Sequence, residues 1–474
     1  MGGIKFGTDG WRAVISDDFT FDNVKKVAQS VADFLNKDCR DLKVKDRRAI
    51  VGYDTRFLSD KYAELVACVL ASNGIKTILS DRPTPTPSVS FAIWDRGLLG
   101  GVIITASHNP GRYNGIKYKT HYGGSAGSEI TKKFEAYLGQ SEIKYLPLEE
   151  LISQGMVEME NLIPKHLAFL KKYVNTALIK KTNMKVLVDS MHGAGNDYME
   201  MILKGGKCKV DTMYKDINPG FEGRAPEPKP ANLKELASKT KSLKYDIGFA
   251  TDGDADRLAV ALPDGKFLTG HKIMALILLH LLEDRKMKGG VIQTVCGTHL
   301  IEKICKKYGL KLYETPVGFK YICDLIEKEN ILIGGEETGG IAFKDSIPER
   351  DGILSALLVM EALAMRKKKA LDLLKAMDKE YGTFEYRRLD EEYPDEKKPK
   401  LMSFLKTNPP RDILGKKVVE TNAADGYKFI CEDRSWLMLR LSGTEPILRV
   451  YAEAPTEKKA FQYLDFGKAL AESI

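Results

Sequence analysis

Short apolar runs alternate with longer amphipathic runs along the chain. Residues 49–53 have the length and composition of a buried strand, and residues 61–72 follow with the spacing of a helix. Asn73 and Gly74 come next, where they favour the end of that helix, and residues 75–79 form another apolar run. This strand–helix–strand order predicts a parallel or mixed sheet covered by helices.

The same rhythm restarts farther along, with apolar runs that we expect to be strands at 185–189, 245–250, 291–295 and 331–333. Each run leads into a loop rich in glycine, threonine or acidic residues. Ligands bind at the carboxyl ends of strands in open α/β sheets, so these loops are the first candidates for a functional site. The charged, proline-containing stretch at 390–411 is expected to lead into a final domain.

Composition narrows the class of protein. The length of 474 residues predicts about three or four domains, and 43% hydrophobic with 29% charged residues is typical of a globular protein. The net charge is only +8, and the lysines are scattered rather than gathered in a dense stripe, so nucleic acid is not an expected partner. Seven cysteines without a C-x-x-C pair argue against a disulfide framework and against a thiolate zinc site.

The sequence also indicates where in the cell the protein is expected to work. No apolar signal segment is visible at the N-terminus, and the longest strongly apolar stretch, 273–282, is too short to cross a bilayer. The cysteine pattern fits a reducing compartment. We therefore expect a cytoplasmic protein with no membrane partner.

Ser107 follows the apolar run 101–104, in the segment Thr-Ala-Ser-His-Asn-Pro at 105–110. A serine beside His108 and near Lys117 could be a nucleophile, because an alcohol needs a base or a positive field to activate it. An Asn-Pro turn with a hydrogen-bonding serine is a common alternative. Taken by itself, this segment favours the turn.

Three aspartates alternate along the loop at 252–257, which reads Asp-Gly-Asp-Ala-Asp-Arg. Carboxylates this close repel one another unless a cation lies among them, and hard oxygen ligands suit Mg²⁺ or Ca²⁺. An EF-hand loop would need glycine and glutamate where the chain has Arg257 and Pro263. The loop therefore predicts Mg²⁺ with a phosphate as a further ligand, rather than an exposed acidic turn.

Two further segments are rich in glycine. In the loop at 334–340 the glycines allow close backbone approach, and Glu336 and Thr338 could bind the hydroxyl groups of a polyol. The segment at 7–12 matches neither a dinucleotide-binding nor a Walker A loop, but its Arg12 could face a phosphate. Glycine-rich turns are frequent, so neither segment identifies a site by itself.

The segment at 440–446 has the composition of an anion site. Its small residues expose backbone N–H groups that can form a concave nest, and Arg440 can bind phosphate oxygens through two hydrogen bonds. Ser442 and Thr444 add hydroxyl donors, and Arg449 follows. A phosphate anchor is the functional interpretation, and a polar turn between two strands is the alternative.

Together these segments resemble the α-D-phosphohexomutase family. The matching pieces, in the family's order, are FGTDGWR at 6–12, TASHNP at 105–110, DGDADR at 252–257, GEETGG at 335–340 and RLSGTEP at 440–446. The resemblance implies an α/β protein of four domains around a central cleft, with three similar mixed-sheet α/β domains and a C-terminal α+β domain. We expect the phosphoserine loop in 1–160, the metal loop in 161–265, the sugar-binding loop in 266–385 and the phosphate-anchoring loop in 386–474.

The resemblance also implies roles for individual residues. Ser107 corresponds to the phosphorylated serine, and its phosphate joins three aspartates as Mg²⁺ ligands: Asp252, Asp254 and Asp256. The residues around the transferring phosphoryl group are Arg12, His108, Lys117 and Arg257. The residues implied in substrate binding are Lys320, Glu336, Thr338, Arg440, Ser442, Gly443, Thr444 and Arg449.

The implied activity is the interconversion of hexose 1-phosphate and hexose 6-phosphate. Phosphoserine donates its phosphoryl group to the sugar monophosphate, a hexose 1,6-bisphosphate forms, and its other phosphate returns to Ser107. The expected cofactors are Mg²⁺ and glucose 1,6-bisphosphate as activator. A general base must take the proton of the attacking hydroxyl, and the sequence leaves both His108 and Lys117 open for that role.

The preferred sugar is expected to be glucose, with mannose, both sugars, or glucosamine as alternatives. Some bacterial phosphomannomutases and phosphoglucosamine mutases have histidine where Gly340 stands, so the glycine favours a phosphoglucomutase. A phosphosugar-binding protein without catalysis would need a broken nucleophile or metal loop, and a Mg²⁺ phosphatase with an aspartate nucleophile would leave Ser107 and Arg440 without a role. Small-molecule hexose phosphates are the expected partners, and the protein is expected to be a monomer or homodimer.

Overall fold

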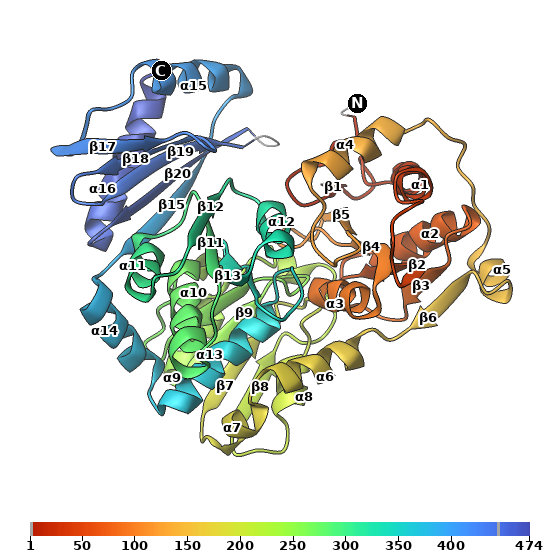
Figure 1. Cartoon of the computed structure of the whole chain (residues 1–474), viewed down its shortest axis with the longest axis horizontal. Helices are drawn as coiled ribbons and strands as arrows, with labels where there is room; N and C mark the ends of the chain where they lie inside the picture. The colour runs from red at the N-terminus through yellow and green to blue at the C-terminus, as the bar shows by residue number, and fades with distance from the viewer. Residues whose placement is uncertain (1–2, 443–445) are drawn as a thin grey trace. The chain divides into compact units, whose positions relative to one another are not determined.

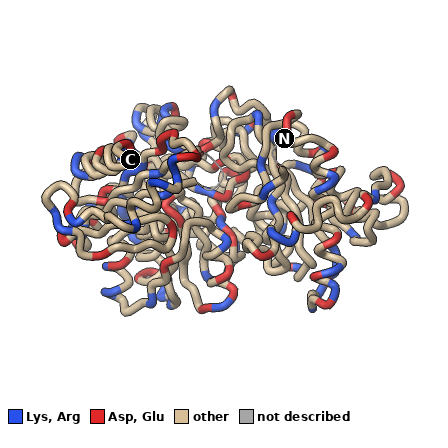
Figure 2. The backbone as a smooth tube through the Cα atoms, turned by 90° about the horizontal axis from the view of Figure 1, so that it is seen from above, with Lys and Arg blue, Asp and Glu red and all other residues tan. Residues whose placement is uncertain are grey.

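The computed structural model describes residues 3–442 and 446–474. The chain forms two compact units. Unit 1 comprises the chain up to Lys288 together with Phe319–Leu371, and unit 2 comprises Gly289–Gly318 together with the chain from Asp372 onward. Basic and acidic residues are interspersed along the backbone (Figure 2), as expected from their scatter in the sequence.

Unit 1 begins with a mixed sheet of six strands in the order β1-β5-β4-β2-β3-β6. Strands β2, β3, β4 and β6 run parallel, whereas β5 is antiparallel to both of its neighbours. The strands are β1 (Trp11–Val14), β2 (Asp46–Tyr53), β3 (Thr77–Ser80), β4 (Leu98–Ile104), β5 (Tyr113–Lys119) and β6 (Val157–Glu160). The helices are α1 (Phe21–Lys37), α2 (Ser59–Ser72), α3 (Thr86–Arg96), α4 (Ser128–Tyr137), α5 (Leu148–Ser153) and α6 (Ile163–Tyr173).

Alternate residues of the central strands enter two different cores, as the two-residue period of a strand requires. Val51 of β2 packs with residues of α1 and α2, whereas Ile50 packs with residues of α3. In the same way Val102 and Ile103 of β4 enter opposite cores. Helices therefore cover both faces of the sheet (Figure 1), and the strand–helix–strand prediction for residues 49–79 is confirmed by β2, α2 and β3.

The second sheet of unit 1 has the order β10-β9-β7-β8. Strand β7 is parallel to β8 and β9, and β10 is antiparallel to β9. Its strands are β7 (Lys185–Asp189), β8 (Lys209–Met213), β9 (Ile247–Thr251) and β10 (Leu258–Ala261), with helices α7 (Thr176–Lys181), α8 (Tyr198–Leu203) and α9 (Lys234–Ser242) and 3₁₀ turns η1 (Phe221–Gly223) and η2 (Pro230–Asn232). The loop at 252–257 with its three aspartates, called the acidic loop below, joins β9 to β10. It therefore lies at the carboxyl end of a strand, as predicted.

The rest of unit 1 holds the antiparallel pair β13 (Ile331–Gly335) and β14 (Ile341–Phe343). The glycine-rich loop at 334–340 contains the turn between these two strands. Helices α10 (Gly270–Leu279), α12 (Phe319–Lys328) and α13 (Gly352–Arg366) accompany them, and α10 continues into a π-helical turn, η3 (His280–Asp284). Among the described residues, no helix is both long and apolar enough to cross a membrane. The apolar stretch at 273–282 belongs to α10 and η3, and its residues 273–281 are buried.

Unit 2 contains the parallel pair β11 (Gly290–Thr294) and β12 (Leu312–Thr315) with α11 (His299–Tyr308) between them. Helix α14 (Ala370–Tyr381) carries the boundary between the units. The C-terminal sheet has the order β15-β20-β19-β18-β17-β16 and is antiparallel throughout. Its strands are β15 (Glu385–Glu392), β16 (Asp412–Ile413), β17 (Lys416–Asn422), β18 (Tyr427–Cys431), β19 (Trp436–Leu441) and β20 (Ile447–Ala454), with η4 (Asp395–Lys397), α15 (Lys398–Thr407) and α16 (Glu457–Glu472).

Candidate active site

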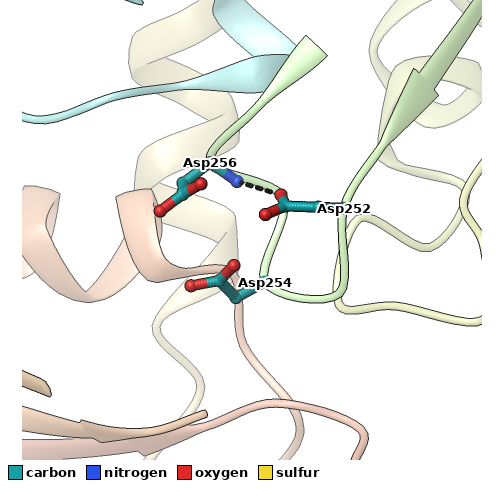
Figure 3. Close-up of side chains that lie close together, drawn as sticks. All are labelled: Asp252, Asp254 and Asp256. Atoms are coloured by element: carbon teal, nitrogen blue, oxygen red, sulfur yellow. Dashed lines mark hydrogen bonds between the residues drawn. The ribbon is translucent and has the colours of Figure 1, made fainter. Parts of the chain in front are cut away.

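The acidic loop folds its three aspartates into one buried cluster (Figure 3). The carboxylates of Asp252, Asp254 and Asp256 each offer an oxygen within 4.8 Å of the others, and all three residues are fully buried. Asp252 shapes the loop, because its Oδ1 accepts hydrogen bonds from the backbone N–H groups of Asp256 and Arg257 at 3.0 and 3.1 Å. Ala255, with φ of 58°, turns the chain back toward β10.

Hydrogen bonds and ion pairs shorter than 3.5 Å from the surrounding protein reach one oxygen of Asp254 and one of Asp256. Asp254 Oδ2 accepts hydrogen bonds from Thr86 Oγ1 at 2.6 Å and from Lys117 Nζ at 2.8 Å. Asp256 Oδ2 is paired with Arg350 Nη2 at 2.7 Å. The other oxygen of each, Oδ1, is buried and has no hydrogen-bond partner among the described residues. Buried carboxylate oxygens are costly without a partner, so this set of oxygen donors fits a hard divalent cation such as Mg²⁺.

Ser107 reaches this cluster from the loop between β4 and β5. Its Oγ donates a hydrogen bond to Asp252 Oδ2 at 2.9 Å and lies 3.5 Å from His108 Nδ1. The residue is fully buried, and its φ of 50° is unusual for a residue other than glycine, which costs on the order of 1–3 kcal/mol. A phosphoryl group on this oxygen would therefore stand beside the aspartates, where a bound cation would offset the repulsion between them.

A buried ion pair that sequence reasoning missed holds the Ser107 loop. Arg56 donates to four backbone carbonyl groups of the loop at 2.6–3.0 Å, one of them that of Ser107 itself. Asp54 binds Arg56 Nε at 3.1 Å and accepts a hydrogen bond from Thr105 Oγ1 at 2.5 Å. Both charged side chains are fully buried. Their position directly after the apolar run 49–53 is the signal that could have identified them.

Lys117 on β5 is a fixed cation in the cluster. Besides Asp254, its Nζ lies 2.9 Å from Asp9 Oδ2 and 3.3 Å from Asp256 Oδ2. Burial lowers the pKa of Lys117, but Asp254, Asp9 and Asp256 outweigh it and raise the pKa above its ordinary value. The pKa of His108 falls well below its ordinary value, because burial and neighbouring cations, Arg257 first, disfavour its charged form.

Two predicted arginines border the same cluster. Arg12, on β1, donates from Nη1 to Asn109 Oδ1 at 2.9 Å and lies 3.5 Å from Asp9 Oδ2. Arg257 Nε lies 4.0 Å from Asp252 Oδ2. Burial favours the neutral form of Asp9, but Lys117 and other nearby cations hold its pKa well below the ordinary value. The cluster thus interleaves carboxylates and cations, and Asp9 is a further member that the sequence did not single out.

The glycine-rich loop places Glu336 and Thr338 in the turn between β13 and β14. Burial raises the pKa of Glu336 to about 7, against the opposing charge of Arg350, whose Nη1 lies 3.4 Å from Glu336 Oε2. Thr338 Oγ1 is buried and has no hydrogen-bond partner among the described residues. Gly339 has φ of 87°, and a Cβ there would lie 2.2 Å from the carbonyl oxygen of Leu258, so the turn requires glycine.

Lys320 stands in the first turn of α12, where burial lowers its pKa. Its Nζ donates a hydrogen bond to Ser128 Oγ at 2.7 Å, at the start of α4. The ammonium group is therefore held within unit 1 by the start of α4, in a buried position from which it can donate to an anionic ligand.

The predicted phosphate anchor lies in unit 2. Arg440 on β19 donates from Nε to Asp425 Oδ2 at 2.8 Å, and the same oxygen accepts the backbone N–H of Val317 at 2.9 Å. Arg449 stands opposite Arg440 on β20, so the structure brings these two guanidinium-bearing residues together with Ser442 at one end of the hairpin. Gly443 and Thr444 lie outside the described residues.

Comparison with known families covers nearly the whole chain. Models of all four domains of the phosphoglucomutase/phosphomannomutase family match in order. The α/β/α domain I matches residues 3–143, domain II matches 164–265 and domain III matches 269–381. The C-terminal domain of the family matches residues 386–466.

Individual relatives match along their full length. The chain is 31% identical to the phosphoglucomutase/phosphomannomutase of Thermococcus kodakarensis, covering 98% of both chains. It is 30% identical to the phosphoglucosamine/phosphogalactosamine mutase of Sulfurisphaera tokodaii, covering 98% of this chain and 99% of the relative. A crystal structure from Thermus thermophilus matches with a TM-score of 0.86 and 30% identity over 99% of both chains. The ordered domain matches and these full-length relatives together show that the chain belongs to the phosphoglucomutase/phosphomannomutase family of phosphohexomutases.

Proposed function

We propose that this protein interconverts hexose 1-phosphate and hexose 6-phosphate, with glucose as the preferred sugar, by phosphoryl transfer to and from Ser107. One observation carries the proposal. The Ser107 hydroxyl, from the first sheet domain, donates to Asp252 in a buried triad of aspartates whose remaining oxygens fit a divalent cation. Phosphoryl transfer depends on positioning and on neutralising charge, and this cluster provides both.

The transfer exchanges one ester bond for another. The P–Oγ bond of phosphorylated Ser107 breaks as a bond forms between phosphorus and a free sugar hydroxyl oxygen. The hydroxyl proton passes to a base, and Ser107 Oγ takes up a proton as it leaves. The hexose 1,6-bisphosphate then returns its other phosphoryl group to Ser107. When bound, Mg²⁺ supplies positive charge to the phosphate oxygens, held by Asp252, Asp254, Asp256 and the phosphorylated serine.

Among the two candidates for the proton transfer, the contacts favour His108. Lys117 Nζ already contacts three carboxylates, so its donors are engaged and it is suited to neutralising charge. His108 Nδ1 lies 3.5 Å from Ser107 Oγ, which is within range of a hydrogen bond that tightens in a substrate complex. Arg12 and Arg257 complete the positive surroundings of the transferred group.

Two groups of residues are proposed to bind the substrate. Glu336 and Thr338 bind sugar hydroxyl groups, with Lys320 as a further donor. Arg440, Ser442 and Arg449, together with Gly443 and Thr444, hold the phosphate that does not react. An anchor of this kind recognises only phosphate, so it accepts either end of the bisphosphate after the sugar reverses.

Three observations bear on the identity of the sugar, and they do not agree. Gly340, in place of the histidine found in some mannose and glucosamine mutases, favours glucose. The relative from Sulfurisphaera tokodaii, named for amino sugars, favours glucosamine 1-phosphate as the second candidate, and the relative from Thermococcus kodakarensis favours activity on both glucose and mannose. These sugars differ at C2, so direct comparison of their 1-phosphates separates the possibilities.

The test is a coupled assay with Mg²⁺ and a trace of glucose 1,6-bisphosphate. Glucose 1-phosphate, mannose 1-phosphate and glucosamine 1-phosphate are offered side by side to the wild type, to Ser107→Ala, and to Ser403→Ala as a matched control on an exposed position of α15. We expect turnover of glucose 1-phosphate to be fastest, lost in Ser107→Ala and retained in Ser403→Ala. A folded, Mg²⁺-loaded and primed protein that turns over none of the three sugars would contradict the proposed function.

A further inference from the structure

Arg350 connects the parts of the site that are proposed to hold the metal and the sugar. It precedes α13, and its side chain is only 2% exposed. Nη2 lies 2.7 Å from Asp256 Oδ2 in the acidic loop and 2.8 Å from Asp9 Oδ2. Nη1 lies 3.4 Å from Glu336 Oε2 in the glycine-rich loop. One planar guanidinium group therefore touches carboxylates from three separate loops of unit 1.

Arg350 is itself held in place by its surroundings. Its guanidinium lies 4.9 Å from the centre of the Phe319 ring, a distance at which a cation and an aromatic face attract each other. Nε lies 3.4 Å from Glu349 Oε1, and Glu349 is in turn bound by Ser125 at 2.7 Å. Two residues later, the N–H of Gly352 donates to Ala255 O of the acidic loop at 3.1 Å. Both the backbone and the side chain of this segment are thus fixed against the acidic loop.

The contact with Asp256 determines which oxygen faces the cluster. Arg350 engages Oδ2, while Oδ1 of the same carboxylate is buried without a hydrogen-bond partner among the described residues. An arginine that holds one oxygen of a ligating carboxylate leaves the other oriented for a cation, which is how groups around a metal ligand commonly set its affinity. The same guanidinium group reaches Glu336, so the metal ligand and the sugar-binding carboxylate share a support.

The absence of a side chain at Gly340 makes room for this support. A Cβ added at Gly340 would lie 2.2 Å from Arg350 Cδ and 2.9 Å from Cγ, closer than any tolerated contact. The φ of Gly340 does not lie in the left-handed region, so its backbone conformation alone would accept alanine. Glycine is needed at this position because the arginine passes through the space that a side chain would fill.

We propose that Arg350 is a positioning residue that fixes Asp256 and Glu336 in one geometry, and that Gly340 is required because a side chain there displaces Arg350. The inference rests on the proposed function for the roles of those two carboxylates. It predicts that disturbing Arg350 weakens divalent-metal binding and sugar binding together, although Arg350 contacts neither ligand.

The test uses four variants of the full chain: Arg350→Met, Arg350→Lys, Gly340→Ala, and Arg366→Met as a matched control. Arg366 stands at the other end of α13, where it pairs with Asp284 at 2.7 Å. Mn²⁺ binding is measured without sugar by electron paramagnetic resonance, and kcat and KM are measured separately with glucose 1-phosphate. Thermal unfolding identifies variants that fail to fold.

We expect Arg350→Met to weaken Mn²⁺ binding by about 10-fold or more, as for other groups that orient a metal ligand, and to raise KM for the sugar phosphate. If Arg350 acted only through its charge, its removal would leave the aspartates more negative and Mn²⁺ would bind more tightly, which would overturn the proposal. Arg350→Lys should recover part of the loss, since an ammonium group cannot bridge carboxylates as a planar guanidinium does. Full recovery by lysine would contradict the positioning role.

Gly340→Ala keeps every charge and tests the same geometry if Arg350→Met does not fold. We expect weaker Mn²⁺ binding and a raised KM, and wild-type values for both would overturn the proposal. Arg366→Met should leave both quantities unchanged. Mn²⁺ binding does not depend on turnover, so a wild type that fails to convert any hexose phosphate would contradict the proposed function while the metal measurement still decides the role of Arg350.

Discussion

The two regions proposed to bind phosphate are built in different ways. Around Ser107, in unit 1, carboxylates and cations are buried and paired with one another, as in the contacts of Asp54 with Arg56 and of Lys117 with Asp254. Around Arg440, in unit 2, the guanidinium has a carboxylate partner, Asp425, whose side chain is 24% exposed. A group that transfers phosphoryl must be fixed within a fraction of an ångström, whereas a group that only holds phosphate needs charge and donors.

The proposed function accounts for this contrast. At the reacting end, charge develops on oxygens at fixed positions, and preorganised donors and cations stabilise it without reorganisation. At the other end, the proposed anchor would bind either phosphate of the bisphosphate. We therefore expect large effects on kcat from changes in the buried cluster and effects on KM from changes in the proposed anchor.

The largest loss of activity is expected from a substitution in the acidic loop, which is predicted to hold the metal ion. Asp254→Asn removes a charge from the predicted Mg²⁺ site while preserving its size, and kcat/KM should fall on the order of 10³-fold, comparable to the loss of a preorganised electrostatic group. Asp264→Asn, in the exposed turn after β10, is the matched control and should behave as wild type. Activity of Asp254→Asn within a few fold of wild type, with Mg²⁺ at saturation, would argue against a metal held by this loop.

The next effect concerns the ion pair beneath the Ser107 loop. Arg56→Lys keeps a positive charge beside Asp54 but cannot donate to four carbonyl groups, so Ser107 should lose its fixed position. We expect kcat to fall about 10²-fold, as for small displacements of a reacting group, with a much smaller change in KM. A wild-type kcat in a folded Arg56→Lys protein would show that the loop is positioned by other contacts.

A smaller effect of a different kind is expected in unit 2. Asp425→Asn weakens the contact that orients Arg440, so KM should rise by about 10-fold for the 1-phosphate and the 6-phosphate alike, with kcat little changed. An equal rise in KM for the two substrates is the diagnostic result. A fall in kcat as large as that of Arg56→Lys would remove the distinction between the two regions.

The smallest effect is expected in the pH dependence of kcat/KM, through the carboxyl group of Glu336. Burial raises its pKa to about 7, so the carboxylate becomes protonated as the pH falls through 7 and becomes a weaker acceptor for the proposed hydrogen bonds from sugar hydroxyl groups. We expect kcat/KM to fall a few fold below pH 7. Glu336→Gln should lose this step while keeping any step that comes from the substrate phosphate, so an unchanged profile in that variant would assign the step elsewhere.

Much of the fold could be predicted from local patterns. The apolar runs at 185–189, 245–250 and 331–333 correspond to β7, β9 and β13, because a strand buried on both faces is apolar at successive positions. The acidic and glycine-rich loops could be located because each follows such a strand directly. The resemblance to the α-D-phosphohexomutase family also rested on short sequence motifs in such loops, and the matching domain models confirm it.

The side chains that hold the candidate site residues in place could not be predicted from local patterns. Arg350 and its partner Asp9 are 341 residues apart in sequence, and no local pattern marks either as buried. Arg350 lies in a charged segment that resembles ordinary solvated surface until the fold closes around it. Long-range pairing of charges is a property of the tertiary structure, so sequence identifies the groups that face the ligand more readily than those that hold them.

The most direct measurement asks where the phosphoryl group resides. The dephosphorylated protein is incubated with Mg²⁺ and glucose 1,6-bisphosphate, digested, and analysed by tandem mass spectrometry, and a second sample is chased with glucose 1-phosphate before digestion. We expect phosphate on Ser107, its removal by the chase, and no phosphate at this position in Ser107→Ala. Phosphate that is absent from Ser107, or that stays on Ser107 through the chase in an active protein, would contradict transfer through this residue.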